Sequence, residues 1–256
     1  MVKIRNISML FMLFVAGLQA QNSDQLLREG DVYFARQSTE LAVEYYRMAN
    51  ARSPRQSATL LRLIRSYSDL GWLHLKKDTS AESYYRLAVA YADTLLEVSP
   101  NSASSHFWMA LAQGSLIPFK TVSEKIRIAK EVRFQAETAV ELDSTFALPY
   151  IILAIFERES SQLSWLERTL ARIVFGEELN GSLSYSEELL EKALTYDPGN
   201  SYAYYELYWT YLAEGKKEAA VQALKNVMAL PVKSQREERQ FVLAQDYLLS
   251  LESSLR

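Results

Sequence analysis

Cysteine and histidine, two residue types that often carry catalysis, are absent or scarce in this chain of 256 residues. It has no cysteine and two histidines, His74 and His106. Without cysteine, disulfides, thiolate zinc sites and thiol nucleophiles are excluded. Two histidines without an adjacent acidic pair make a poor metal site, so we expect no metal and no cofactor. Gly215-Lys216-Lys217 lacks the earlier glycines and the hydroxyl of a phosphate-binding loop. We therefore predict no catalytic residue and no enzymatic activity.

Binding chemistry is better represented, because one segment carries large apolar side chains at steps of three and four residues. These residues are Tyr202, Tyr205, Trp209 and Leu212. In a helix this spacing places all four on one face. Aromatic side chains anchor peptides well because they bury a large area with few rotatable bonds. We predict that the four residues bind a protein or peptide partner. The alternative is that they pack against the C-terminal helix.

A second segment, over residues 163–176, begins with a helix-start signal. Its signature is Ser164, Trp165, Leu166, Glu167 and Arg168. Serine followed three residues later by glutamate is typical of a capping box. This helix could line a pocket for a lipid or another apolar ligand. The alternative is that Trp165, Leu166, Leu170 and Ile173 dock it onto the rest of the chain.

Glycine and proline, the usual turn-forming residues, are also scarce. The chain has 8 glycines and 6 prolines, about 5.5% of its residues, against roughly 12% in an average protein. β-Sandwiches and β-barrels need glycine and proline at their many turns, so we predict an all-α protein. With 49% hydrophobic residues, it can bury a sizeable core.

The prolines mark an internal repeat. Pro54, Pro100, Pro198 and Pro231 each end a helical pattern, and Asp143 occupies the equivalent place between the second and third. Sequence intervals of this length between helix ends are typical of stacked helix pairs. We predict repeats over 23–56, 57–100, 101–144, 145–200 and 201–233, then a capping helix over 234–252. Capping-box pairs mark several predicted helix starts: Thr79–Glu82, Thr121–Glu124, Ser164–Glu167, Ser184–Glu187 and Ser234–Glu237.

The first and last repeats match the tetratricopeptide pattern. In the last, the matching residues are Tyr204, Leu207, Tyr211, Ala220 and Leu224; in the first, they are Gly30, Tyr33, Ala42, Tyr46, Ala49 and Pro54. We predict a tetratricopeptide-type α-α superhelix of about five helix pairs, with an inserted helix and a C-terminal capping helix, forming one domain over 21–256. A non-repeat helical bundle with the same spacing of small and large residues is the alternative.

The N-terminal residues are typical of a signal peptide. Lys3 and Arg5 precede a short apolar run that ends before Ala20. This run is too short for a comfortable membrane span. We predict cleavage after Ala20 and a periplasmic or secreted protein. An uncleaved anchor is the alternative, and we expect membrane contact only in that case.

The charge of the chain argues against nucleic acid as a partner. The net charge is −3 for the full sequence, and about −5 without residues 1–20, which hold two bases and no acid. A chain of this charge does not attract nucleic acid over long range.

From about residue 101 to 249 the sequence resembles the regulator of microtubule dynamics family. The resemblance rests on the following segments: Trp108 to Gly114, Lys125 to Lys130, Ala139 to Asp143, Leu163 to Arg168, Glu191 to Leu194, Gly215 to Ala219 and Leu230 to Ser234. It implies an atypical tetratricopeptide protein without enzymatic activity. Members are described as microtubule-associated or as tethers at membrane contacts, and one branch is associated with phospholipid transfer.

These observations predict an exported scaffold or adaptor that binds a protein or peptide on its concave face. A carrier of a lipid or other apolar ligand is the alternative. An open groove favours the first function, and a closed apolar tunnel favours the second.

Overall fold

The computed structural model describes residues 22–75, 80–176 and 180–255, and the regular elements in these ranges are helices. The first helix covers 22–35. The following elements are α2 (Thr39–Arg52), α3 (Ser57–His74), α4 (Ala81–Val98), α5 (Ala103–Gly114), the short 3₁₀ helix η1 (Ile117–Phe119), α6 (Val122–Leu142), α7 (Ala147–Ser161), α8 (Trp165–Phe175), α9 (Leu183–Tyr196), α10 (Ser201–Ala213), α11 (Lys217–Ala229) and α12 (Gln235–Leu255). The predicted signal peptide and the capping box at Thr79 lie outside the described residues.

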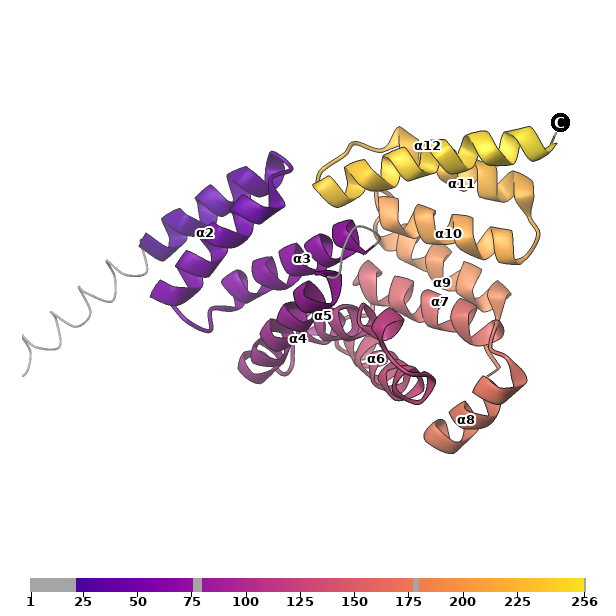
Figure 1. The fold of residues 1–256 in the computed structure, drawn as a ribbon, viewed down its shortest axis with the longest axis horizontal. Helices are drawn as coiled ribbons and strands as arrows, with labels where there is room; N and C mark the ends of the chain where they lie inside the picture. Colours follow the sequence, from indigo (N-terminus) through magenta and orange to yellow (C-terminus); the bar gives the residue numbers. More distant parts are fainter. Residues whose placement is uncertain (1–21, 76–79, 177–179, 256) are drawn as a thin grey trace, which may run out of the picture.

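The helices stack in pairs along a curved row, as Figure 1 shows. The pairs are 22–35 with α2, α3 with α4, α5 with α6, α7 with α9, and α10 with α11. The pair α7–α9 forms even though α8 lies between its members in sequence. This arrangement confirms the prediction of a tetratricopeptide-type all-α fold with an inserted helix.

Glycine allows the two helices of a pair to approach closely at equivalent places in the first two pairs. A Cβ atom on Gly71 would lie 2.5 Å from the ring of Tyr85, and one on Gly30 would meet the ring of Tyr46. Each tyrosine ring therefore occupies the space that a larger residue would fill. The sequence match at Gly30 and Tyr46 reflects this packing.

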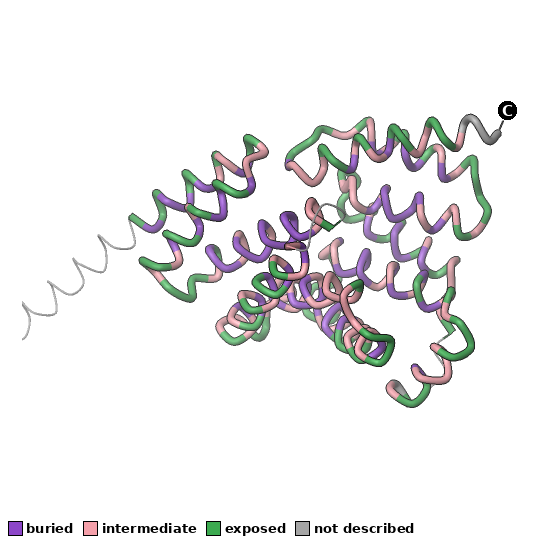
Figure 2. Tube along the Cα trace, viewed as in Figure 1, coloured by how far each residue is buried: buried purple, intermediate pink, exposed green. Residues whose placement is uncertain are grey.

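Alanines pack where helices cross deeper in the fold. Ala42, Ala88, Ala136, Ala193 and Ala220 are fully buried. Figure 2 shows the buried residues along the facing sides of neighbouring helices, with the exposed ones on the outer turns. Small residues let backbones approach, and larger buried side chains such as Tyr46, Ile151 and Leu224 fill the remaining space in the core.

The helix starts match the predicted capping boxes at two positions and differ at another. Thr121 and Ser164 each form the full box with the glutamate three residues later. The prediction at Ser184 is wrong. The cap of α9 is Ser182, whose hydroxyl accepts a hydrogen bond from the Tyr185 amide at 3.2 Å. Helix α9 therefore includes Ser184 in its first turn.

The curved row closes on itself at α12. This helix packs on α11 and α10, and its N-terminal end also contacts α3. The contact includes Arg236, whose guanidinium lies 3.5 Å from a carboxylate oxygen of Asp69. We call this ion pair the closing contact. Because of it, the inner side of the superhelix is bounded by α12 as well as by the repeats.

Candidate functional site: a cavity inside the superhelix

A cavity of about 490 Å³ lies on the inner side of the curved row. This volume falls in the range of roughly 300–1,000 Å³ that small-molecule sites occupy. The apolar lining includes Trp72 and Leu75 at the end of α3, Leu111 of α5, Ile126 and Val132 of α6, Ile152, Ile155 and Phe156 of α7, Ala171 of α8, and Tyr202 and Tyr205 of α10. Such a wall favours a hydrocarbon ligand because it supplies apolar area and few hydrogen-bonding groups.

Gly114 at the end of α5 also lines the cavity. A Cβ atom there would meet only the methyl groups of Val132, at 3.7 and 3.9 Å, among its nearest described neighbours. These are ordinary van der Waals distances. A Cβ atom therefore fits at position 114, whereas one at position 71 would meet the Tyr85 ring.

Polar groups from several helices line the cavity. Lys125 of α6 and Glu167 of α8 line one part, while Glu206, Arg236 and Gln240 line the part bounded by α10 and α12. Helices α8 and α12 lie on opposite sides of the molecule in Figure 1. Glu159 and Ser160 of α7 and Ser115 after α5 also line the cavity, so polar groups are spread along a wall that is mainly apolar.

The guanidinium of Arg236 lies near two aromatic rings. It lies 5.3 Å from the ring centroid of Trp72 and 5.1 Å from that of Tyr202. A cation over an aromatic face is stabilised by the ring quadrupole. Burial raises the pKa of Asp69, although Arg236 and Arg65 oppose the shift. The carboxylate that faces Arg236 is thus held in an environment that disfavours its charge.

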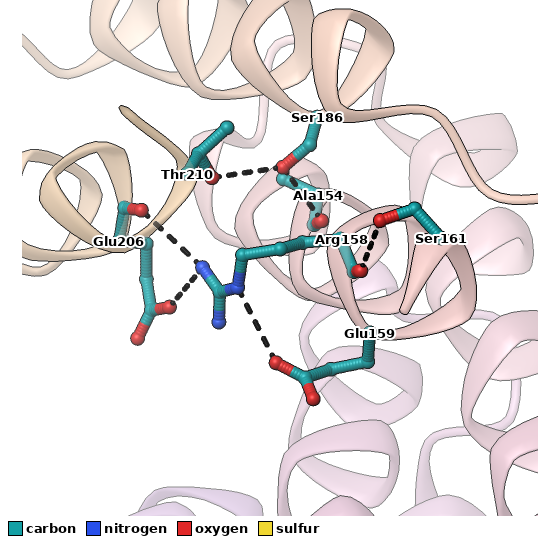
Figure 3. Close-up of polar contacts among 7 residues, drawn as sticks. All are labelled: Ala154, Arg158, Glu159, Ser161, Ser186, Glu206 and Thr210. Atoms are coloured by element: carbon teal, nitrogen blue, oxygen red, sulfur yellow. Dashed lines mark hydrogen bonds and ion pairs between the residues drawn. The ribbon is translucent and has the colours of Figure 1, made fainter. Parts of the chain in front are cut away.

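A second buried ion pair includes the cavity residue Glu206 and is drawn in Figure 3. The guanidinium of Arg158 on α7 lies 2.9 Å from the carboxylate of Glu206 and donates to its backbone carbonyl at 3.3 Å. Burial opposes the charge of Arg158, but Glu206 and Glu159 outweigh it, so the pKa of Arg158 is raised. Nearby, the Ser186 hydroxyl lies 3.1 Å from the hydroxyl of Thr210. These contacts fix α7, α9 and α10 relative to one another.

The predicted partner-binding residues are divided between the cavity and the core. Tyr202 and Tyr205 line the cavity. The ring of Trp209 lies 5.5 Å from the ring of Tyr247 on α12, and Leu212 packs against the same core cluster. A peptide would reach Tyr202 and Tyr205 through the cavity, whereas Trp209 contacts the C-terminal helix. Binding of a partner by these residues stays a prediction.

Of the four residues expected to dock the inserted helix α8, only Leu170 packs against the described core. Ala171, Leu170 and Val174 pack against Ile126 and Phe156. On the other side of the helix, three apolar residues are exposed: Trp165 by 77%, Leu166 by 53% and Ile173 by 76%. The expectation that these three dock the helix is wrong, because the helix faces α6 through its small residue Ala171.

The three polar members of the α8 signature, Ser164, Glu167 and Arg168, hold the helix start. The carboxylate of Glu167 accepts hydrogen bonds from the Ser164 amide at 2.9 Å and from its hydroxyl at 2.6 Å. These bonds lower the pKa of Glu167. Arg168 donates to the carbonyls of Leu163 and Ser161, both at 3.0 Å. The signature therefore fixes the turn that leads into α8.

The histidines lie apart from the cavity. The ring nitrogens of His106 contact the side-chain oxygen of Gln135 at 2.6 Å and the carbonyl of Pro100 at 2.8 Å. The ring of His74 lies 5.4 Å from that of Tyr84. Within the described residues, no three acidic, histidine or cysteine side chains are grouped so as to hold a metal ion.

Sequence reasoning missed Arg236, Gln240 and Gly114 as site residues. The segment over 234–252 was interpreted only as a cap. Arg236 and Gln240 are four residues apart and share one face of α12. This pairing of a basic residue with an amide residue on one face of a capping helix was the sequence signal for a polar group in the cavity wall.

Comparison with known proteins identifies relatives along most of the chain. The family model described as "Regulator of microtubule dynamics protein 1-3" matches residues 24–251, a wider span than the resemblance over 101–249. Regulator of microtubule dynamics protein 3 of Rattus norvegicus is 28% identical over 144 residues, which cover 56% of this chain and 30% of that protein. Regulator of microtubule dynamics protein 1 of Mus musculus is 22% identical over 218 residues, which cover 84% and 70% respectively.

A solved structure supports the fold independently. TTC0263, a tetratricopeptide protein of Thermus thermophilus, superposes with a TM-score of 0.64 at 15% identity, covering 89% of this chain and 99% of that one. In the described part of this chain, no helix combines the length and apolar character needed to cross a membrane.

Proposed function

Because the chain belongs to the regulator of microtubule dynamics protein 1–3 family, we propose that it is a non-enzymatic tetratricopeptide-type carrier that binds an apolar, lipid-like ligand inside its superhelix. The observation that carries the proposal is the cavity of about 490 Å³ with its mainly apolar lining. The closing contact adds support, because α12 and α3 bound the inner side of the row.

The cavity also fits this function energetically. Each methylene moved from water into an apolar site contributes about 0.8 kcal/mol, which is roughly a fourfold gain in affinity. We expect a series of straight-chain alcohols to bind more tightly by about this factor per carbon until the cavity is full. Affinity that does not depend on chain length would contradict the proposal.

The direct test is native mass spectrometry of the full chain purified without detergent. We expect a co-purifying lipid-like molecule on the wild type. The variant Gly114→Leu should reduce its occupancy, because it places a large side chain at the cavity wall without backbone conflict. Gly114→Ala adds one methyl group at the same position and is the matched control. A wild type that carries no such molecule and binds none of the added alcohols would refute the function.

A protein or peptide partner on the concave face is the second candidate. It is favoured by Tyr202 and Tyr205, which line the cavity, and by the tetratricopeptide fold, which is used for protein binding generally. Pull-down with wild type and Gly114→Leu separates the two candidates. A protein recovered with the wild type and lost with Gly114→Leu supports the peptide function. Recovery of no protein would count against it.

We also propose that the protein is exported after cleavage behind Ala20. The support is the sequence pattern of Lys3, Arg5 and the apolar run that follows. N-terminal sequencing of the mature protein tests this proposal. A chain that begins at Gln21 is expected, and a chain that retains Met1 would instead indicate an anchor.

A further inference from the structure

One polar side chain in the cavity wall has an unused donor. Gln240 of α12 is only 2% exposed and lines the cavity. Its amide nitrogen has no hydrogen-bond partner among the described residues. A buried donor without a partner is unfavourable, since it has lost water and gained nothing in exchange. A ligand with an oxygen acceptor would supply the missing partner.

Arg236 stands one helical turn before Gln240 and lines the same cavity. Residues four apart in a helix lie on the same face, so both side chains approach a ligand from one side. A guanidinium has five N–H donors. The hydrogen bond from Arg236 to Asp69 is 3.5 Å long, whereas a strong charge-assisted bond is roughly 2.7–2.9 Å. Arg236 therefore retains donor capacity.

The neighbouring carboxylates do not saturate this cation. Glu206, which also lines the cavity, is paired with Arg158 at 2.9 Å. Asp69 is buried, and its raised pKa means that its charged form is disfavoured. The distance between Arg236 and Asp69 is 3.5 Å, which is longer than the 2.9 Å between Arg158 and Glu206. An additional anionic oxygen would find a cation and an amide donor side by side.

We propose that Arg236 and Gln240 bind the carboxylate of a long-chain acid whose hydrocarbon tail fills the cavity. This inference rests on the proposed function, because the tail needs the apolar wall. It adds the chemical class of the ligand and its orientation, with the headgroup at α12 and the tail toward α6 and α7. The aromatic rings of Trp72 and Tyr202 then lie beside the headgroup region.

The test compares three probes of equal chain length, dodecanoate, dodecanol and dodecylamine, by calorimetric titration of the full chain. We expect dodecanoate to bind about tenfold more tightly than dodecanol, as a hydrogen bond to a charged group would give. Gln240→Met keeps the size of the side chain and removes the donor. It should lower the affinity for dodecanoate severalfold and the affinity for dodecanol less, because a neutral hydroxyl oxygen accepts a weaker hydrogen bond than a carboxylate does. Dodecylamine is the probe of opposite charge, and it should bind the wild type more weakly than dodecanol does, because its ammonium group would face the Arg236 cation.

The outcomes separate this inference from the function beneath it. Equal binding of dodecanoate and dodecanol to the wild type would overturn the headgroup site and leave the apolar carrier standing. An unchanged preference in Gln240→Met would overturn the role of Gln240. Binding of none of the three probes would refute both proposals. Arg236→Gln should also reduce the preference, with thermal unfolding as the control for loss of the closing contact.

Discussion

The ion pair between Arg158 and Glu206 gives the sharpest prediction about stability. Their side chains are only 9% and 8% exposed, and the pair joins α7 to α10. Replacing Arg158 by methionine would leave the Glu206 carboxylate buried without its cation. Loss of one partner of a buried pair costs about 3–5 kcal/mol. For a chain of this size, that free energy corresponds to a fall of roughly 6–20 °C in the melting temperature.

Urea unfolding, followed by circular dichroism and by tryptophan fluorescence, measures this free energy. The exposed neighbour offers a matched control. Glu159 also contacts Arg158, at 3.3 Å, but its side chain is 66% exposed, so Glu159→Gln should cost at most about 1 kcal/mol. The double variant Arg158→Met/Glu206→Leu should recover part of the loss, because it removes the unpaired charge. The reasoning is refuted if Arg158→Met costs no more free energy of unfolding than Glu159→Gln. It is also refuted if the loss in the double variant equals the sum of the losses in Arg158→Met and Glu206→Leu.

Three further predictions concern packing, pH and the surface. Gly71→Ala should lower the free energy of unfolding by about 1–3 kcal/mol, because the new methyl group meets the Tyr85 ring; urea unfolding measures the loss, and a neutral result would show that the ring moves freely. Burial raises the pKa of Asp69 above its usual 3.8, so the folded chain binds this proton more tightly than the unfolded chain, and the wild type should lose stability relative to Asp69→Asn as pH rises above that value. Urea unfolding of both proteins from about pH 4 to pH 7 checks this, and a difference that is constant or grows in favour of the wild type would contradict it. Trp165→Phe should change the free energy of unfolding by less than about 0.5 kcal/mol, because the Trp165 side chain is largely exposed; a larger loss in thermal unfolding would show that the outer face of α8 is covered.

The fold was predictable from sequence because its determinants are local. Ala42, Tyr46 and Leu224 occupy repeat positions, and their burial follows from the contact of adjacent helices. Helix starts such as Ser164 were also predictable, since a capping box involves residues only three apart. The family resemblance over 101–249 was confirmed and extended by the match to 24–251.

The cavity was harder to predict because it depends on contacts between distant segments. Arg236 reaches Asp69 across 167 positions of sequence, and no local pattern signals this approach. The orientation of α8 was missed for a related reason. An amphipathic helix predicts that one face docks, but Ala171 rather than Trp165 faces the repeats. Small residues mark the docking face when the backbones approach closely.

The closing contact also affects how the chain comes apart. In a linear repeat array each unit touches only its neighbours, so unfolding can start at either end and proceed inward. Here the helices from α3 to α12 form a loop in space that is joined at its two ends. Fraying of α12 would break contacts with the second pair as well as with the last. The helix over 22–35 and α2 stand outside this loop and join it through α3, with which they share one hydrophobic cluster and the ion pair of Asp31 with Arg62. Their unfolding would therefore uncover buried residues of α3 such as Leu63 without breaking the closing contact.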